Sequence, residues 1–397
     1  ELKPMNKDPV VIVAARRTPI GAFQGAFGSV SAVELSTAAS SAALGDSGLD
    51  SADIGEVLLG CVLPAGLGQA PARQASLAAG VPKAVPCTTV NKVCGSGMKT
   101  TMLGHDLLLA GSANIVLTGG MESMSGAPYL MPKARSGYRM GHQEVLDHMF
   151  WDGLQNPYDG NMMGHFAEQT ARQYDFSRED QDAFAITSVN RAKDAAANGR
   201  FDAEITPVTV RSRRGETVVS ADEGPNVADV DKIPTLRPAF AKDGTVTAAS
   251  SSSISDGAAS LVLMRASDAK KRSIEPLATI AGHAGFAHEP EWFTTAPVSA
   301  INALHGRLGW DAGNVDLYEI NEAFACVTMA AMHDVGIDHA KVNVNGGACA
   351  LGHPIGASGA RIIVTLLHAL RNRGGGRGIA SLCIGGGEAV AIGIEAA

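Results

Sequence analysis

The sequence predicts an α/β fold with a mainly parallel sheet. Short apolar runs, typical of strands that are buried on both faces, alternate with helical stretches along most of the chain. The chain has 397 residues, of which 45% are hydrophobic and 18% are charged, and this suits a globular protein with more than one domain. An order of elements found in the first part of the chain returns near its end, which indicates a duplicated α/β unit.

The first part of the chain alternates between apolar strands and helices. The expected elements are, in order, the strand 10–15, the helix 31–45, the strand 57–62, the short helix 71–80, the helix 98–110 and the strand 114–118. Helices that join parallel strands make right-handed crossovers, so this alternation predicts a mainly parallel sheet.

The pattern changes between residues 126 and 250, where aromatic and charged residues gather and strand signals are weak. Two helices are expected there, over 161–174 and 177–199, and Ser177 with Asp180 resembles a capping box at the start of the second. A linker would not carry two such helices, so we expect an inserted domain.

The α/β pattern then resumes. The expected elements are the strands 260–264, 277–282, 315–320, 378–383 and 388–394 and the helices 298–308, one opened by 321–325, and 360–371. The small-residue corner, helix and strand around Cys94 recur in the same order around His353. A duplicated unit would bring these corners together at the strand ends, where open α/β sheets bind ligands. The alternative is that this repeated order of elements is only the general pattern of α/β proteins and does not indicate a duplication.

The expected domains follow from these changes of pattern. They are an N-terminal half formed by residues 1–125 and 251–275, an inserted loop domain over 126–250, and a C-terminal half over 276–397.

The composition argues against several classes of protein. A net charge of -8 disfavours a nucleic-acid binder, and no apolar run is long enough to span a membrane. The first eight residues are polar and lack the apolar region of a signal peptide. Six cysteines without CxxC spacing suit a reducing compartment. We therefore expect a cytoplasmic protein with no nucleic-acid or membrane partner.

Cys94 lies in the stretch Val-Asn-Lys-Val-Cys-Gly-Ser-Gly-Met-Lys, at an expected strand-to-helix corner. The positive end of a helix dipole lowers the pKa of a thiol, which favours a nucleophile. Gly95 and Gly97 leave room for an acyl group. A buried structural cysteine is the alternative, because free cysteine is among the most buried residue types.

His353, Cys383 and Asn321 also lie on small-residue loops at expected strand ends. Taken alone, they read as a turn residue, a core residue and a helix cap. Together with Cys94 they fit covalent acyl transfer, in which His353 holds the thiol proton and Cys383 supplies a second acid or base. Backbone N–H groups at Cys94 and in the Gly385 run would bind an oxyanion. For the remaining cysteines we expect structural roles: Cys61, Cys87, Cys326 and Cys349.

Five long motifs in order make the chain resemble the thiolase family over nearly its full length. They are Asn-Lys-Val-Cys-Gly-Ser-Gly-Met-Lys, Gly-Gly-Met-Glu-Ser-Met-Ser, Asn-Glu-Ala-Phe-Ala, Gly-His-Pro-Ile-Gly-Ala-Ser-Gly and Cys-Ile-Gly-Gly-Gly. The resemblance implies a duplicated, five-layered α/β/α/β/α core with an inserted loop domain, usually in a homotetramer.

The resemblance also implies roles for the reactive residues. Cys94 would take an acyl group from acyl-CoA after His353 activates its thiol, and Cys383 would remove an α-proton from acetyl-CoA. Asn321 would hold a water that forms one oxyanion hole with His353. The N–H groups of Cys94 and Gly385 would form the other.

Coenzyme A would, by the same resemblance, lie across the inserted domain as substrate or product. No tightly bound cofactor and no metal is expected. Ser252 is the polar candidate for the pantetheine part. The matching positions are Leu236, Phe240, Ala248, Ser252, Met163 and Phe324.

Cys-Gly-Ser-Gly-Met-Lys resembles the acetoacetyl-CoA type of thiolase, which implies an acetyl-CoA C-acetyltransferase that condenses two acetyl-CoA to acetoacetyl-CoA. The alternatives are a broader-range degradative 3-ketoacyl-CoA thiolase, a decarboxylating ketoacyl synthase, and a non-catalytic acyl-CoA or lipid carrier on the same scaffold. Phe293 replaces the Met of the family pattern Met-Gly-x-Gly-Pro, so we expect a narrowed acyl pocket.

Overall fold

The computed structural model describes residues 8–213 and 215–397, so most of the polar leading segment lies outside the described residues. The strands are β1 (Val10–Arg17), β2 (Gly21–Ala22), β3 (Glu56–Gly60), β4 (Cys87–Val90), β5 (Ile115–Ser123), β6 (Tyr129–Leu130), β7 (Leu146–Asp147), β8 (Val208–Ser212), β9 (Gly215–Val219), β10 (Ser255–Arg265), β11 (Ala278–Ala287), β12 (Leu317–Ile320), β13 (Gly376–Ile384) and β14 (Glu388–Ala396). The helices are α1 (Ala32–Asp46), α2 (Pro71–Ala78), α3 (Ser96–Ala110), α4 (Met163–Gln173), α5 (Arg178–Ala197), α6 (Glu223–Val227), α7 (Ala266–Lys271), α8 (Ala296–Leu308), α9 (Ala325–Val335), α10 (Ala348–Leu351) and α11 (Ile355–Arg371).

Within the described residues, ten strands form one sheet in the order β12-β13-β14-β11-β1-β10-β5-β3-β4, with β2 beside β10. Pairing is parallel where β3 meets β4 and β5 and where β12 meets β13. β1 instead pairs antiparallel with β10 and β11. The expectation of a mainly parallel sheet is therefore wrong, because β10 runs antiparallel between β1 and β5, and β14 runs antiparallel between β11 and β13.

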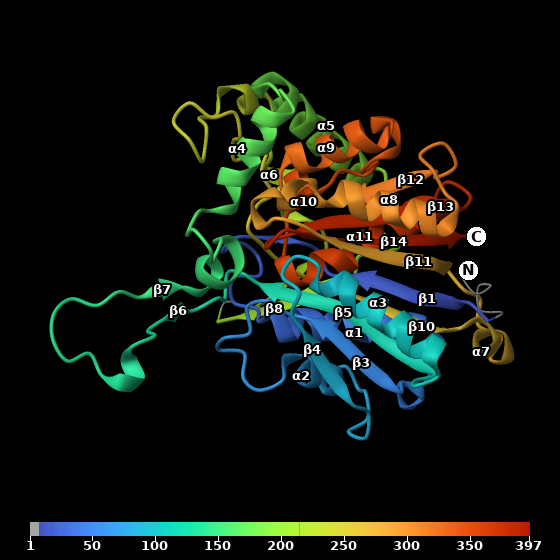
Figure 1. The fold of residues 1–397 in the computed structure, drawn as a ribbon. Helices are drawn as coiled ribbons and strands as arrows, with labels where there is room; N and C mark the ends of the chain where they lie inside the picture. Colours follow the sequence, from blue (N-terminus) through green and yellow to red (C-terminus); the bar gives the residue numbers. More distant parts are fainter. Residues whose placement is uncertain (1–7, 214) are drawn as a thin grey trace.

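The helices form layers against the two halves of this sheet (Figure 1). α3 and α11 lie between the halves, since α11 packs on β5 and β10 and also on β12 and β13. α1 covers the outer face of the N-terminal strands, and α8 covers the outer face of β11 and β14. This is the α/β/α/β/α arrangement.

The layers explain why the strands are apolar without alternation. In β1, Val10 and Ile12 belong to the central cluster around α3 and α11, whereas Val11 and Val13 belong to the outer cluster under α1. Both faces of the strand are covered, so both sets of side chains are buried.

The two halves of the sheet join at a short ladder between β1 and β11. Val11 pairs with Thr279 and Ile12 with Ala278. The ladder makes the halves one continuous structure.

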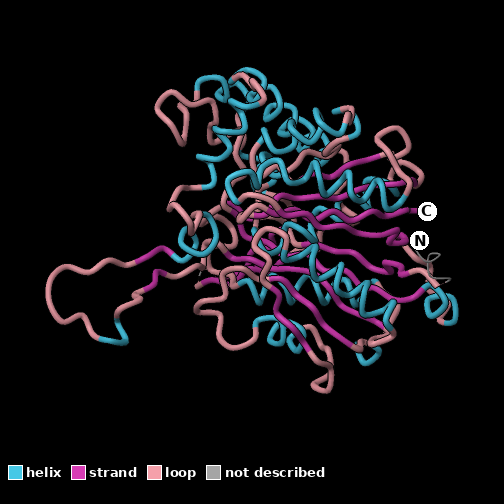
Figure 2. Tube along the Cα trace, in the orientation of Figure 1, coloured by secondary structure: helices cyan, strands magenta, loops and turns pink. Residues whose placement is uncertain are grey.

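The segment between β5 and β10 adds no strand to the large sheet in its described part. It forms two small antiparallel pairs, β6 with β7 and β8 with β9, where the sequence showed weak strand signals. The chain between β6 and β7 projects from the body as an arm that is mostly loop (Figure 2). The exact domain boundaries stay a prediction.

Among the described residues, no helix combines the length and the apolar character needed to cross a membrane.

Candidate active site

Cys94 lies at a tight corner between β4 and α3. The helix begins at Ser96 with Gly95 as its N-cap, slightly earlier than expected. Val93 has a φ of 46°, a left-handed conformation that is rare for a β-branched residue. The side chain of Asn91 accepts the Val93 N–H at 2.9 Å, and the Ser96 hydroxyl donates to the Val93 carbonyl at 2.7 Å. These bonds hold the strained turn that presents Cys94.

His353 lies at the matching corner before α11. Its Nδ1 is 2.5 Å from the hydroxyl oxygen of Ser358, and the Ser358 hydroxyl donates a hydrogen bond to the Pro354 carbonyl at 2.9 Å. The hydroxyl oxygen therefore accepts a hydrogen bond from the Nδ1–H group, which leaves the lone pair on Nε2. Nε2 is buried and has no hydrogen-bond partner in the structure. The imidazole is thus set up to accept a proton at Nε2.

Close packing of α3 and α11 brings the two corners together. A Cβ added at Gly359 would clash with the main-chain nitrogen of Met98, so the helix ends touch only because glycine stands there. The Cys94 corner also meets the end of β13, where a Cβ at Gly95 would overlap the side chain of Ile384.

Cys94, His353 and Gly385 line one pocket of about 210 Å³. Four residues expected to contact coenzyme A also line it: Met163, Phe240, Ser252 and Phe324. Leu236, which is half-buried, and Ala248, which is exposed, do not belong to its wall.

Several apolar wall residues were not found from the sequence. They are Met124, Phe150, Leu154, Met162, Ile254 and Ile355. Phe150 and Leu154 lie in a short helical turn after the arm, where an isolated cluster of large apolar residues was the available signal.

Neither Cys383 nor Asn321 lines this pocket. Cys383 is fully buried in an apolar cluster that includes the wall residues Phe293 and Phe324. Asn321 is also fully buried, and neither Oδ1 nor Nδ2 of its side chain has a hydrogen-bond partner in the structure. Buried amide groups are rarely left without partners, so this amide is suited to bind a water or a ligand oxygen.

Burial controls the proton affinity of the Cys94–His353 pair. It raises the pKa of the Cys94 thiol to about 11, although the backbone N–H groups of Gly385 and of Cys94 itself act in the opposite direction. Burial, assisted by the charge of Arg361, lowers the pKa of His353 to about 3. The expected lowering of the thiol pKa by the helix terminus is therefore wrong for the free protein. At neutral pH the pair is a thiol and a neutral imidazole.

Burial also raises the pKa of Cys383 well above its ordinary value, with a further contribution from Cys94. The two sulfurs are thus close enough to influence each other. All six cysteines are unpaired in the structure.

Glu122, from the Gly-Gly-Met-Glu motif, fixes the second corner. Its buried carboxylate accepts the N–H of Val62 at 3.0 Å, of Leu63 at 3.1 Å and of Gly356 at 2.8 Å. Burial raises the pKa of Glu122 to about 7, against the lowering effect of these N–H donors. Gly356 lies in the first turn of α11, so Glu122 ties β5 to the segment that carries His353. The motif was recognised in the sequence, but this role was not.

Comparison with known proteins agrees with this fold. Residues 10–267 match the family described as thiolase, N-terminal domain, and residues 274–396 match thiolase, C-terminal domain. An acetyl-CoA acetyltransferase from Pseudomonas aeruginosa is 48% identical over 385 residues, which cover 96% of this chain and 98% of that protein.

Two solved structures share the whole architecture. The Acat5 thiolase from Ascaris suum in complex with coenzyme A is 42% identical with a TM-score of 0.93, covering 98% of this chain and 100% of that one. The acetyl-CoA acetyltransferase from Bacillus anthracis is 41% identical with a TM-score of 0.96, covering 98% and 99%. The resemblance found in the sequence motifs is thus confirmed over both halves, and the chain belongs to the thiolase family.

Proposed function

We propose that this protein is an acetyl-CoA C-acetyltransferase that reversibly condenses two acetyl-CoA molecules to acetoacetyl-CoA and coenzyme A. The observation that carries the proposal is the meeting of Cys94, His353 and Gly385 in one pocket, with Cys383 buried in an apolar cluster that shares residues with its wall. A nucleophile, a base and an oxyanion donor are the groups that acyl transfer requires.

In the first half-reaction, Nε2 of His353 takes the Cys94 proton as the sulfur attacks the thioester carbonyl of acetyl-CoA. General-base activation is needed because the resting pair is neutral. The carbon–sulfur bond to coenzyme A breaks, and the departing sulfur takes the proton of Cys383. The products are acetyl-Cys94, free coenzyme A, the Cys383 thiolate and the His353 imidazolium.

In the second half-reaction, the Cys383 thiolate removes an α-proton from a second acetyl-CoA. The resulting carbanion attacks acetyl-Cys94, which forms the new carbon–carbon bond and breaks the bond to sulfur. Cys94 then recovers its proton from the His353 imidazolium. All groups return to their starting states, and thiolysis is the same sequence in reverse.

Two sets of donors would stabilise the negative oxygens. The backbone N–H groups of Cys94 and Gly385 both act on the Cys94 sulfur in the free protein, so an oxygen on the acetyl group would lie within their reach. The unpartnered amide of Asn321 would hold a water that, with Nε2 of His353, binds the thioester oxygen of the second substrate.

Coenzyme A would approach over the segment from Leu236 to Ser252. Phe240 packs edge-on against Phe324, with 5.9 Å between ring centroids, at the wall of the pocket. Ser252 would bond the pantetheine part, and Leu236 and Ala248 would contact coenzyme A beyond the wall. Binding of coenzyme A by the Ascaris suum thiolase, which shares this fold, supports the placement. The expectation of no tightly bound cofactor stays a prediction.

A bulky residue in the pocket wall favours a short acyl group. Phe293 lines the pocket and is almost fully buried, so a longer acyl chain would have to displace a packed aromatic ring.

The deciding experiment measures coenzyme-A-dependent thiolysis across a ladder of 3-ketoacyl-CoA substrates of increasing length. A sharp preference for acetoacetyl-CoA is expected. Comparable or higher activity on longer chains would instead identify a degradative 3-ketoacyl-CoA thiolase. Turnover of no member would favour a carrier, and a requirement for malonyl thioesters in condensation would favour a ketoacyl synthase.

The covalent step has its own test. Iodoacetamide should label Cys94, and acetyl-CoA should block the labelling. A Cys94→Ala variant should lose thiolysis, whereas Cys87→Ser, which changes a half-buried cysteine outside the pocket, should keep it. Full activity in Cys94→Ala would refute the mechanism.

We also propose a homotetramer. The arm between β6 and β7 exposes large apolar side chains, among them Met131 at 52% and Met140 at 91%. Such residues are costly to leave in water, which favours their burial between subunits. Light scattering on the purified protein tests this, and a monomer at all concentrations would contradict it.

A cytoplasmic location is proposed from the cysteines. All six are unpaired, which suits a compartment that keeps thiols reduced. Fractionation of the source cells, followed by detection of the protein, tests the proposal.

A further inference from the structure

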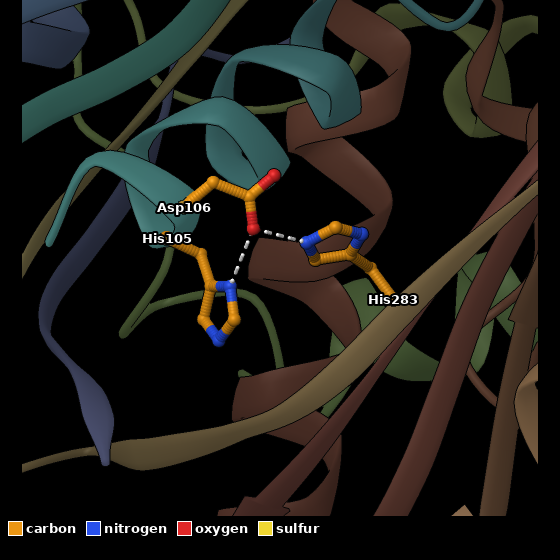
Figure 3. A group of neighbouring side chains, drawn as sticks. All are labelled: His105, Asp106 and His283. Carbon is orange, nitrogen blue, oxygen red and sulfur yellow. Dashed lines mark hydrogen bonds and ion pairs between the residues drawn. The ribbon is translucent and has the colours of Figure 1, made fainter. Parts of the chain in front are cut away.

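We propose that His105, Asp106 and His283 form a binding site for one divalent transition-metal ion of the zinc class. The three side chains converge at the contact between α3 and β11 (Figure 3). No residue of this cluster lines the acyl pocket, so the proposal does not depend on the acyl-transfer function.

The spacing of the ligand atoms fits one ion. Nδ1 of His105 is 3.2 Å and Nε2 of His283 is 2.9 Å from the same oxygen, Oδ1 of Asp106. All three atoms lie within 4.8 Å of one another. Zinc binds imidazole nitrogen and carboxylate oxygen at about 2.0–2.2 Å, so two ligands on a tetrahedral ion are about 3.3 Å apart. The two nitrogen–oxygen separations are therefore within about 0.4 Å of the spacing that such an ion requires.

The types of ligand select the metal. Two imidazoles and one carboxylate suit zinc, cobalt, nickel or copper, whereas magnesium and calcium prefer sites made of oxygen atoms. The fourth tetrahedral position would be open to a water molecule.

The scaffold is rigid and the site is accessible. His105 and Asp106 lie on α3 and His283 lies on β11, so none of the ligands depends on a loop. The centroids of the two imidazole rings lie 5.1 Å apart and the ring planes meet at 86°, an edge-to-face arrangement. The histidine side chains are only 11% and 15% exposed, but Asp106 is 53% exposed and offers the ion a route from solvent.

An ion here would join the two halves of the molecule. α3 belongs to the N-terminal half and begins at the Cys94 corner, and β11 belongs to the C-terminal half. His105 lies about 14 Å along the helix from its start, too far to touch the acyl group. The ion would therefore act as a structural clamp. Asp106 and His283 are 177 residues apart in the chain, which explains why no metal site was expected from sequence spacing.

The test uses the full-length protein freed of metal with EDTA and titrated with cobalt(II), then with zinc(II). The wild type should bind one equivalent, show cobalt absorption without a thiolate charge-transfer band, and unfold at a higher temperature with zinc. His283→Gln and Asp106→Asn should each weaken binding by more than about tenfold, because even the loss of an outer-shell partner has that effect. His142→Gln, at an exposed histidine on the arm, is the matched control.

Equal metal affinity in the wild type and His283→Gln would overturn the proposal. So would the absence of binding to the wild type, or a thiolate band that places the cobalt on the cysteines. The unfolding temperature of each metal-free variant shows whether it folds. A folded Asp106→Asn variant keeps the test valid if His283→Gln does not fold.

Discussion

Nδ1 of His353 lies 2.5 Å from the hydroxyl oxygen of Ser358, which lies in the first turn of α11. Because the Ser358 hydroxyl donates a hydrogen bond to the Pro354 carbonyl, its oxygen accepts a hydrogen bond from the imidazole Nδ1–H and fixes the tautomer that leaves Nε2 basic. The reactivity of the proposed base is therefore set by a residue that does not line the acyl pocket.

Ser358→Ala should reduce kcat for acetoacetyl-CoA thiolysis by about ten- to hundredfold, since the imidazole loses its orienting partner but keeps its basic nitrogen. KM should change little, because Ser358 does not line the pocket. Steady-state kinetics measures both constants. Ser40→Ala removes a hydroxyl that is equally buried and bonded to Ser260 at 3.0 Å, and it should leave kcat unchanged. Equal kcat in Ser358→Ala and the wild type would show that the tautomer needs no such partner.

Alkylation of Cys94 should become steadily faster as the pH rises. The thiolate is the reactive form, and a pKa of about 11 means that its fraction grows about tenfold per pH unit between roughly pH 7 and pH 10. An ordinary cysteine, with a pKa of about 8.5, would level off near pH 9.5. Iodoacetamide rates in the free protein, measured by mass spectrometry of the Cys94 peptide, distinguish these cases. A plateau at neutral pH would instead reveal a thiolate–imidazolium pair.

Glu122→Ala should lower the free energy of unfolding by about 3 kcal/mol. The change leaves the N–H groups of Val62, Leu63 and Gly356 buried without an acceptor, and each such loss costs about 1–3 kcal/mol. Urea unfolding at about pH 8, where a group of pKa about 7 is ionised, measures the effect. Glu216→Ala, at an exposed glutamate, is the control. Equal midpoints for Glu122→Ala and the wild type would show that other acceptors replace the carboxylate.

Phe293→Leu should broaden the substrate range. A smaller side chain leaves room for about two methylene groups, each worth roughly 0.8 kcal/mol, so kcat/KM for a substrate longer by two carbons should rise about tenfold relative to acetoacetyl-CoA. Competition between the two substrates gives this ratio directly. Phe184→Leu, which changes a buried phenylalanine on α5 outside the pocket, should leave the ratio unchanged. An unaltered ratio in Phe293→Leu would mean that another residue limits chain length.

The sequence was sufficient to predict those strands and corners whose determinants lie close together in the chain. Strands such as β1 are recognisable because both faces are covered, so apolar residues run without interruption. The corners at Cys94 and His353 are recognisable because small residues and long motifs surround them. Those motifs identified the thiolase family, which the family matches confirm. The roles of the individual site residues stay predictions.

Features that depend on contacts distant in the chain were not accessible from the sequence. The alternation of strands and helices does not predict that β10 lies between β1 and β5. This position of β10 gives the sheet antiparallel as well as parallel pairs. The sequence indicated both the dipole of α3 and the alternative of burial at Cys94, but it could not show that burial outweighs the dipole. Motif matching likewise could not show that Leu236 and Ala248 lie outside the pocket wall.

The position of β1 in the sheet has a consequence for biosynthesis. Both of its neighbours, β10 and β11, come roughly 240 residues or more later in the chain. A ribosome adding about 5–20 residues per second would need about 12–50 s to reach them. Throughout that time the Val-Val-Ile-Val segment lacks both of its partner strands, so the nascent chain carries an unpaired apolar strand of the kind that is prone to aggregate.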